Sequence, residues 1–218
     1  VWLPQLRAKF GSIAGEIAAP WFWARVHDRT RSLGYLRGGF KRFYQRLAER
    51  IAGLGGELRF GTEVTGIERQ GDGTFTASTT AGAGGADRGV SALPTRLTCR
   101  LAPQLPDEFR DRYGGGLAFG AHCLILSLDR PLSTSYWLSI LHPSIPFMAL
   151  VEHTNWLAPS DYEGRHLVYL GVYRPMDDPV YAMSAQELLA AYAPGLALIN
   201  PSFAPGSVRA TWACAAPC

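Results

Sequence analysis

The stretch that decides the fold runs from Leu36-Arg37-Gly38-Gly39-Phe40 to Val90-Ser91-Ala92-Leu93-Pro94. After the double glycine, apolar residues over 41–54 recur at helical spacing and share one face, while charged residues occupy the other. Gly55-Gly56 follows, and such a pair commonly ends a helix in the left-handed conformation. The sequence therefore predicts an amphipathic helix that begins at one glycine turn and ends at another.

After this helix the hydrophobic period falls to two, the period of a strand. Residues 58–60, 62–68 and 75–80 alternate or are β-branched, and Gly71-Asp72-Gly73 supplies a turn. The glycine-rich run 81–85 has no helix and no Lys-Ser/Thr pair after it, so we interpret it as the solvated end of a hairpin and not as a phosphate-binding loop. A short antiparallel meander is predicted, followed by helices over 95–101 and 107–113.

The flanking segments complete the expected fold. Helical spacing predicts helices over 3–17 and 21–31, which would form a small N-terminal cap. Ser184 and Glu187 form a capping box for a helix that Pro194-Gly195 would end. Buried strands of one sheet are predicted at residues 124–128, 136–141, 147–151, 166–173 and 208–212. The fold class is α+β, with a mixed, largely antiparallel sheet, flanking helices and the helical cap. We expect residues 1–218 to form a single domain.

Composition excludes several classes of protein. With 218 residues, 47% hydrophobic and 18% charged, the chain can bury one sizeable core and is not expected to be disordered. The formal charge of +3 comes from scattered arginines without a basic run, so no nucleic-acid partner is expected. No segment reaches the roughly 18 apolar residues of a membrane-spanning helix, and no signal peptide is evident. We expect a cytoplasmic protein without a transmembrane segment.

Residue types that carry chemistry are sparse and scattered. The five histidines stand in no two-ligand spacing, so no metal site is expected. There is no Gly-x-Ser-x-Gly, and the pair Asp177-Asp178 precedes Pro179, which is typical of a turn. Four cysteines, at positions 99, 123, 214 and 218, form no Cys-x-x-Cys pair and are interpreted as reduced thiols. We therefore expect no catalytic residue in this chain.

The order and spacing of these segments resemble the middle of FAD-dependent amine oxidase-like oxidoreductases, the group that includes protoporphyrinogen oxidases and phytoene desaturases. Further segments that carry the resemblance are Trp21-Phe22-Trp23-Ala24-Arg25, Leu128-Asp129-Arg130-Pro131-Leu132, Tyr136-Trp137 and Val151-Glu152-His153-Thr154-Asn155-Trp156. No Gly-x-Gly-x-x-Gly follows an apolar strand near residue 1, so the usual dinucleotide-binding unit is absent.

The resemblance implies that residues 1–218 are the substrate-binding domain of a longer enzyme. Such an enzyme transfers a hydride from an apolar or amine-type substrate to flavin. FAD is then expected in the full-length protein and not in this chain, which would be inactive alone. The implied partners are a small-molecule substrate and the remaining FAD-binding domain of the same polypeptide. The alternative is a non-catalytic α+β module that binds a lipid or isoprenoid.

The resemblance also implies site residues. Gly38 and Gly39 match a double glycine close to the flavin, where a missing Cβ allows the backbone to approach the cofactor. Val64 matches a residue whose backbone meets the adenine, and Ala92 matches a strand end near the cofactor. Residues expected to line the substrate cavity are Trp137, His153, Asn155 and Trp156. The alternative for the glycines is a simple helix-entry turn, and for Val64 and the aromatic residues a place in the core.

Overall fold

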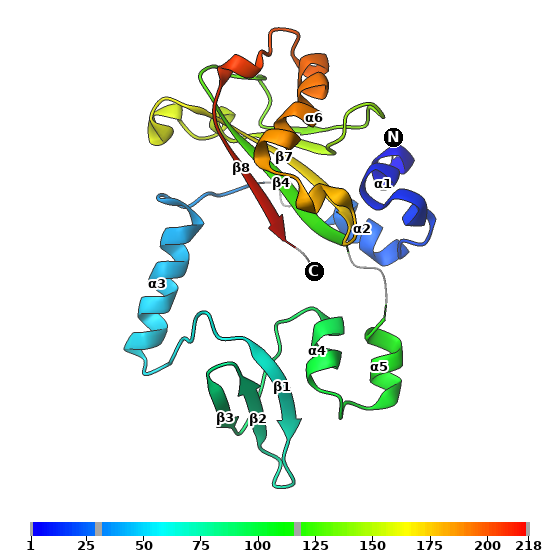
Figure 1. Cartoon of the computed structure of the whole chain (residues 1–218), viewed down its shortest axis with the longest axis vertical. Coiled ribbons are helices and arrows are strands. Elements are labelled where there is room, and N and C mark those ends of the chain that lie inside the picture. The colour runs from blue at the N-terminus through cyan, green and yellow to red at the C-terminus, as the bar shows by residue number, and fades with distance from the viewer. Residues whose placement is uncertain (1, 29–31, 116–118, 217–218) are drawn as a thin grey trace. The chain divides into compact units, whose positions relative to one another are not determined.

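The computed structural model describes residues 2–28, 32–115 and 119–216. The chain divides into two compact units. Unit 1 comprises residues 1–22 and 117–218, and unit 2 comprises residues 23–116. Both sheets are antiparallel and are combined with helices (Figure 1), which confirms the predicted α+β class. That the whole chain acts as one domain stays a prediction.

Unit 1 is built on a five-stranded sheet in the order β5-β6-β7-β4-β8, and every neighbouring pair is antiparallel. The strands are β4 (Phe119–Leu128), β5 (Trp137–Ser139), β6 (Ala149–Glu152), β7 (His166–Pro175) and β8 (Val208–Ala216). The predicted placement of these segments in one sheet is confirmed. Several bounds were wrong, because β4, β7 and β8 are longer than predicted and β5 is shorter.

One face of this sheet carries the core of unit 1. Helix α6 (Ala185–Ile199) packs against it (Figure 1). Because side chains alternate along a strand, every second side chain in the central parts of β4, β6 and β7 belongs to the core that this helix covers. The most deeply buried of these side chains are Leu124, Leu126, Leu150, Val168 and Leu170. The buried apolar residues of these strands therefore lie on one face of the sheet, the face that α6 covers.

The predicted end of α6 at Pro194-Gly195 was wrong, because the helix continues to Ile199. The Ser184–Glu187 capping box at its start is confirmed. A proline inside a helix removes one backbone hydrogen bond and costs about 3 kcal/mol. Leu188, Tyr192 and Leu196, all buried against the sheet, outweigh that cost. Tertiary packing has overridden a local stop signal.

The N-terminal segment was predicted as one helix over 3–17, and this was wrong. Helix α1 (Trp2–Phe10) ends where Gly11 takes a φ of 59°, and a 3-10 helix, η1 (Gly11–Gly15), follows. Helix α2 (Ala19–His27) then begins, while residues 29–31 of the predicted 21–31 helix lie outside the described residues. The glycine breaks the helix because its left-handed conformation cannot continue the α-helical ladder.

Aromatic contacts fix these helices to the sheet of unit 1. The rings of Phe10 and Phe119 lie 6.5 Å apart, edge to face. The ammonium group of Lys9 lies 5.3 Å from the ring centre of Trp21 and 4.8 Å from that of Tyr173. This cation–π cluster joins α1 and α2 to β7.

Unit 2 begins its regular structure with α3 (Gly39–Gly53), the predicted amphipathic helix. Gly55 has a φ of 83°, and the Gly56 N–H donates to the carbonyl of Ile51 at 2.9 Å, so the predicted glycine stop is confirmed. Short helices α4 (Thr95–Leu101) and α5 (Asp107–Tyr113) are also confirmed.

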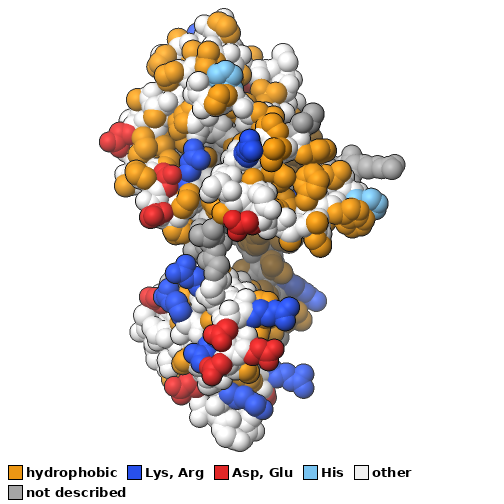
Figure 2. Space-filling view, turned by 90° about the vertical axis from the view of Figure 1, so that its right-hand side faces the viewer, with side chains coloured by type: hydrophobic (Ala, Val, Ile, Leu, Met, Phe, Trp, Pro, Cys, Tyr) orange, Lys and Arg blue, Asp and Glu red, His pale blue; other side chains and the backbone are white. Residues whose placement is uncertain are grey.

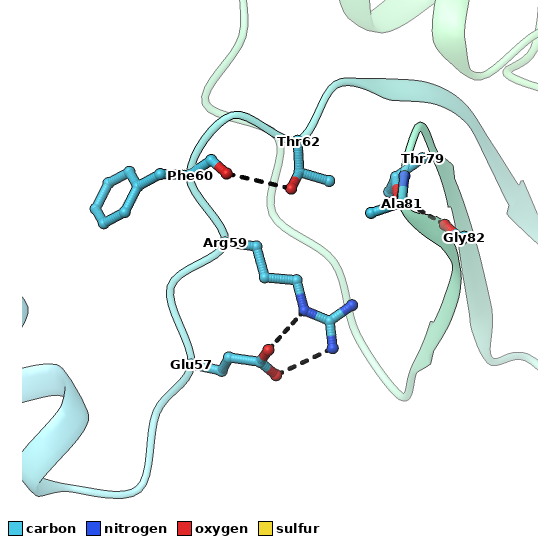
Figure 3. Close-up of polar contacts among 7 residues, drawn as sticks. All are labelled: Glu57, Arg59, Phe60, Thr62, Thr79, Ala81 and Gly82. Atoms are coloured by element: carbon cyan, nitrogen blue, oxygen red, sulfur yellow. Dashed lines mark hydrogen bonds and ion pairs between the residues drawn. The ribbon is translucent and has the colours of Figure 1, made fainter.

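The meander of unit 2 is confirmed, although its strands differ from the predicted ones. They are β1 (Val64–Arg69), β2 (Phe75–Thr79) and β3 (Gly82–Ala86), in the order β1-β2-β3. Residues 58–60 form no strand, and the glycine-rich run predicted to be a hairpin end is the exposed edge strand β3. The Thr79 hydroxyl donates to the Gly82 carbonyl at 2.6 Å across this turn (Figure 3). Residues 82–86 therefore form a strand through backbone pairing with β2, although their small side chains do not predict one.

Candidate functional site

The double glycine in unit 2 forms the entry to α3. Gly38 and Gly39 have φ values of 83° and 75°, which side chains rarely tolerate. A Cβ on Gly38 would lie 2.8 Å from Cδ of Arg42. As the cap residue, Gly38 also has no side chain to accept from the first N–H groups of the helix. The turn therefore leaves backbone N–H groups exposed at the N-terminus of α3, where they can donate hydrogen bonds to a ligand.

A surface hollow of about 480 Å³ adjoins this turn. It is open to solvent and lies along the polar face of α3. Its lining residues are Gly38, Lys41, Arg42, Gln45, Arg46 and Glu49. Three cations against one carboxylate, beside the positive end of a helix dipole, favour an anionic group over a cationic one.

Val64 and Ala92 lie in the same unit as the double glycine. Val64 is half-buried and begins β1, where the register with β2 shifts. Because β1 is an edge strand, one row of its backbone donors and acceptors has no strand partner. The preceding Glu63 is already used, since its N–H donates to the Thr80 hydroxyl at 3.2 Å and its carbonyl accepts from the Thr80 N–H at 2.9 Å.

The segment that leads from α3 into β1 is held by local polar contacts (Figure 3). Both oxygens of Glu57 accept from the guanidinium of Arg59, at 2.7 and 3.0 Å. The Thr62 hydroxyl donates to the Phe60 carbonyl at 3.4 Å. Ala92 lies in an exposed segment before α4 that is anchored by a 2.7 Å hydrogen bond between the hydroxyls of Ser91 and Thr98.

All four predicted cofactor residues thus belong to unit 2, and all four predicted substrate residues belong to unit 1. Unit 1 carries a second distinctive surface, the face of the five-stranded sheet opposite α6, which we call the open face. Its members alternate with the buried leucines and valines along each strand and are half-buried or exposed. They include Cys123, Ile125, Trp137, Val151, Tyr169, Trp212 and Cys214.

The open face is apolar, and its largest side chains are accessible. Trp137 is 56% exposed and Trp212 is 50% exposed. Helix α1 reaches the sheet at Phe119 and Tyr173, which lie at one end of β4 and β7. Figure 2, which does not single out this face, shows hydrophobic side chains spread among polar ones over one side of unit 1. Accessible aromatic surface of this kind is typical of a binding surface.

His153 lies in the 3-10 helix η2 (His153–Asn155), which follows β6. Its Nε2 is 2.7 Å from the hydroxyl of Tyr162, and its ring packs edge to face on Tyr169 at 5.7 Å. Burial lowers the pKa of the His153 imidazole below its ordinary value. A neutral, buried His153 therefore packs against Tyr169.

Asn155 and Trp156 hold the loop before β5. The Asn155 amide donates to the carbonyls of Ser133 and Ser135, at 2.9 and 3.0 Å. Trp156 is 37% exposed and packs edge to face on Tyr136 at 5.0 Å. Of the four predicted substrate residues, Trp137 projects from the open face, and His153 packs against Tyr169 of that face. Asn155 and Trp156 hold the loop before β5, the strand that carries Trp137.

A buried carboxylate that sequence reasoning did not single out completes this support. Glu152 is fully buried, and its two oxygens accept from the N–H of Leu132 at 2.9 Å and the N–H of Ser133 at 2.6 Å. It also accepts from the Ser133 hydroxyl at 2.8 Å. Its signal in the sequence was a lone acidic residue at the end of an apolar strand. Trp212 and Tyr169 were also missed, and only the strand register could have revealed them.

Among the described residues, no cluster of three His, Cys, Asp or Glu side chains could hold a metal ion. No helix in the ranges 2–28, 32–115 and 119–216 is long and apolar enough to cross a membrane. Asp178 accepts from the Val180 N–H at 2.9 Å, which confirms its expected role in a turn.

Comparison with known proteins places this geometry in context. The family model of flavin containing amine oxidoreductases matches residues 8–210. Comparison with curated proteins gives no match.

Solved structures show the same fold at low identity. A protein provisionally named protoporphyrinogen oxidase, from Exiguobacterium sp. 255-15, is 18% identical with a TM-score of 0.70, over 88% of this chain and 41% of its own. An oxidoreductase from Methanosarcina mazei is 20% identical with a TM-score of 0.61, over 81% of this chain and 42% of its own. Reduced UDP-galactopyranose mutase is 17% identical with a TM-score of 0.65, over 82% and 39%. The chain therefore spans about two fifths of the length of each.

Proposed function

The chain belongs to the family of flavin containing amine oxidoreductases, and on that premise we propose that it is the substrate-binding part of an FAD-dependent oxidoreductase. The open face forms a wall of the substrate cavity. The substrate is an apolar or amine-type molecule that loses a hydride to the flavin. The observation that carries this proposal is an accessible apolar sheet face, with Trp137 and Trp212 at its surface, in a chain of this family.

The aromatic side chains of the open face suit an apolar substrate. Trp137 and Trp212 present flat surfaces that bind apolar groups without needing hydrogen-bond partners. Glu152 and Asn155 fix the loop that precedes β5, and so they fix the position of Trp137. Neutral His153 supports Tyr169 without adding a charge to the face. The wall is therefore both apolar and rigidly supported.

The residues proposed to hold FAD fit such a group. The turn at Gly38 and Gly39 has positive φ angles that disfavour side chains and leaves helix N–H groups exposed, and cations line the adjoining hollow, which suits an anionic dinucleotide. Val64, in an edge strand, offers backbone groups to a base, and Ala92 lies in an exposed segment of the same unit. When bound, the flavin supplies the hydride acceptor. The residues of this chain then orient the substrate and exclude water from it.

The rest of the flavin site is proposed to come from a further domain of the same polypeptide. The relatives of known structure are more than twice as long as the matched segment. Helix α3 and the residue that follows it also carry exposed apolar side chains, Phe40, Phe43, Leu47 and Leu54, as expected of a surface covered by such a domain.

The test uses the complete product of the gene that encodes these residues. Its flavin should bleach under anaerobic conditions with a substrate from a panel that includes primary amines and protoporphyrinogen. Trp137→Ala should raise the substrate concentration for half-maximal bleaching about tenfold, because one aromatic contact is lost. Trp23→Ala is the matched control, since Trp23 is also 56% exposed but lies in α2. Equal effects of the two substitutions would refute the assignment of the open face.

A further inference from the structure

Two thiols oppose each other on the open face. Cys123 in β4 and Cys214 in β8 are register partners of an antiparallel pair. Cys123 is half-buried, Cys214 is exposed, and both are free thiols. The register is regular on either side, with Leu124 opposite Ala213 and His122 opposite Ala215. Because Leu124 and His122 are buried on the α6 side, both sulfur atoms belong to the other face.

This placement satisfies the geometric requirement for a disulfide. Residues directly opposite in an antiparallel pair have Cα atoms about 4.5 to 5.5 Å apart. Disulfides usually join Cα atoms about 4.4 to 6.8 Å apart. Cys123 and Cys214 can therefore be joined through side-chain rotation, without a change of strand register.

We propose that Cys123 and Cys214 form an oxidative modification site that closes to a cross-strand disulfide by exchange with a small organic disulfide. The exposed thiolate of Cys214 attacks one sulfur of that disulfide, forms a mixed disulfide and releases one thiolate. The thiol of Cys123 then loses its proton and attacks the sulfur of Cys214, which expels the second thiolate. Two cysteine thiols lose two electrons and two protons, and the small disulfide becomes two thiols.

The order of these steps follows from the surroundings of each thiol. Cys214 is exposed and can meet the reagent first. Cys123 is half-buried between β7 and β8, and burial raises the pKa of its thiol to about 11, so it is the slower nucleophile. The mixed disulfide on Cys214 therefore forms first, and Cys123 resolves it.

Closure would bind the edge strand β8 covalently to its neighbour β4. The link encloses the chain from residue 123 to residue 214, a long loop whose closure restricts the unfolded state strongly. We expect oxidation to raise the melting temperature of unit 1 by roughly 10 °C. The bond would also lie beside Trp212, and so it would stiffen this edge of the open face.

The experiment treats the unaltered chain with oxidised glutathione, blocks remaining thiols in acid, and maps disulfide-linked peptides by mass spectrometry. The expected result is a peptide pair joined through Cys123 and Cys214, lost on reduction, together with the raised melting temperature. In Cys123→Ser, glutathione should remain on Cys214 as a stable adduct. Cys99→Ser, at a cysteine in α4 of unit 2, is the matched control and should leave the linkage intact.

Two results would overturn the proposal. One is a stable glutathione adduct on Cys214 in the unaltered chain without a linked peptide. The other is linkage of Cys214 to Cys99 or Cys218 in place of Cys123. The peptide map identifies both partners directly, so the answer does not depend on whether a variant folds.

Discussion

Replacing Glu152 by glutamine should destabilise unit 1 by about 3 kcal/mol. One carboxylate oxygen accepts from the Leu132 N–H, and the other accepts from the N–H and the hydroxyl of Ser133. An amide keeps one acceptor and turns an NH₂ group toward a buried donor. An unsatisfied buried donor costs about 1–3 kcal/mol, and the remaining bonds lose their charge assistance, which adds about 1 kcal/mol.

Urea unfolding followed by tryptophan fluorescence measures this loss. Five of the six tryptophans, at positions 2, 21, 137, 156 and 212, belong to unit 1, so the signal reports mainly on that unit. Glu152→Ala should cost more than Glu152→Gln, because all three accepted bonds are lost. Exposed Glu16→Gln is the control and should change stability by less than about 0.5 kcal/mol. A Glu152→Gln midpoint that matches the control would refute the reasoning.

Three further outcomes are expected. Lys9→Met should lower the free energy of unfolding of unit 1 by about 1 kcal/mol in the same assay, because a cation over the rings of Trp21 and Tyr173 is lost; an unchanged midpoint would contradict the contact. Burial raises the pKa of the Cys123 thiol to about 11, so this thiol is almost wholly protonated at pH 8 and iodoacetamide should alkylate it slowly. The rate of alkylation should increase as the pH is raised toward 11. Equal labelling of Cys123 and Cys214 at pH 8, measured by mass spectrometry, would be inconsistent with this. Gly38→Ala should cost about 1 kcal/mol in thermal unfolding followed by circular dichroism, because alanine disfavours a φ of 83°; a stabilised variant would show that the turn has another conformation.

Much of the fold could be predicted where local pattern and packing agree. The segments that form β4 and β7 were identified as strands from their runs of apolar and β-branched residues, and in the structure one face of each strand is buried in the core under α6. The Ser184 capping box and the Gly55 stop were also legible, since each depends on hydrogen bonds or dihedral angles within a few residues.

The errors arose where distant parts of the chain decide the outcome. Pro194 remains inside α6 because side chains on either side of it pack on the sheet. The run at Gly82–Ala86 is a strand only because β2 offers it a partner. A sequence without its strand register could not show these effects.

The candidate site was predictable in part. The double glycine was named from the resemblance, and the structure places both residues in the left-handed region, which glycine adopts readily. Trp137 was named from the resemblance, and its place on the open face is visible only once β5 is paired with β6. Glu152 and the pair Cys123 and Cys214 were missed, because their partners lie far along the chain.

The most direct test of the proposed function is the visible absorption spectrum of the complete product of the gene. The account predicts that this protein purifies with the absorption bands of oxidised flavin, whereas residues 1–218 alone are colourless and show no thermal shift with FAD. A complete, folded gene product that contains no flavin and binds none when FAD is added would contradict it. A yellow, FAD-loaded preparation of residues 1–218 would contradict the claim that this chain supplies only part of the flavin site.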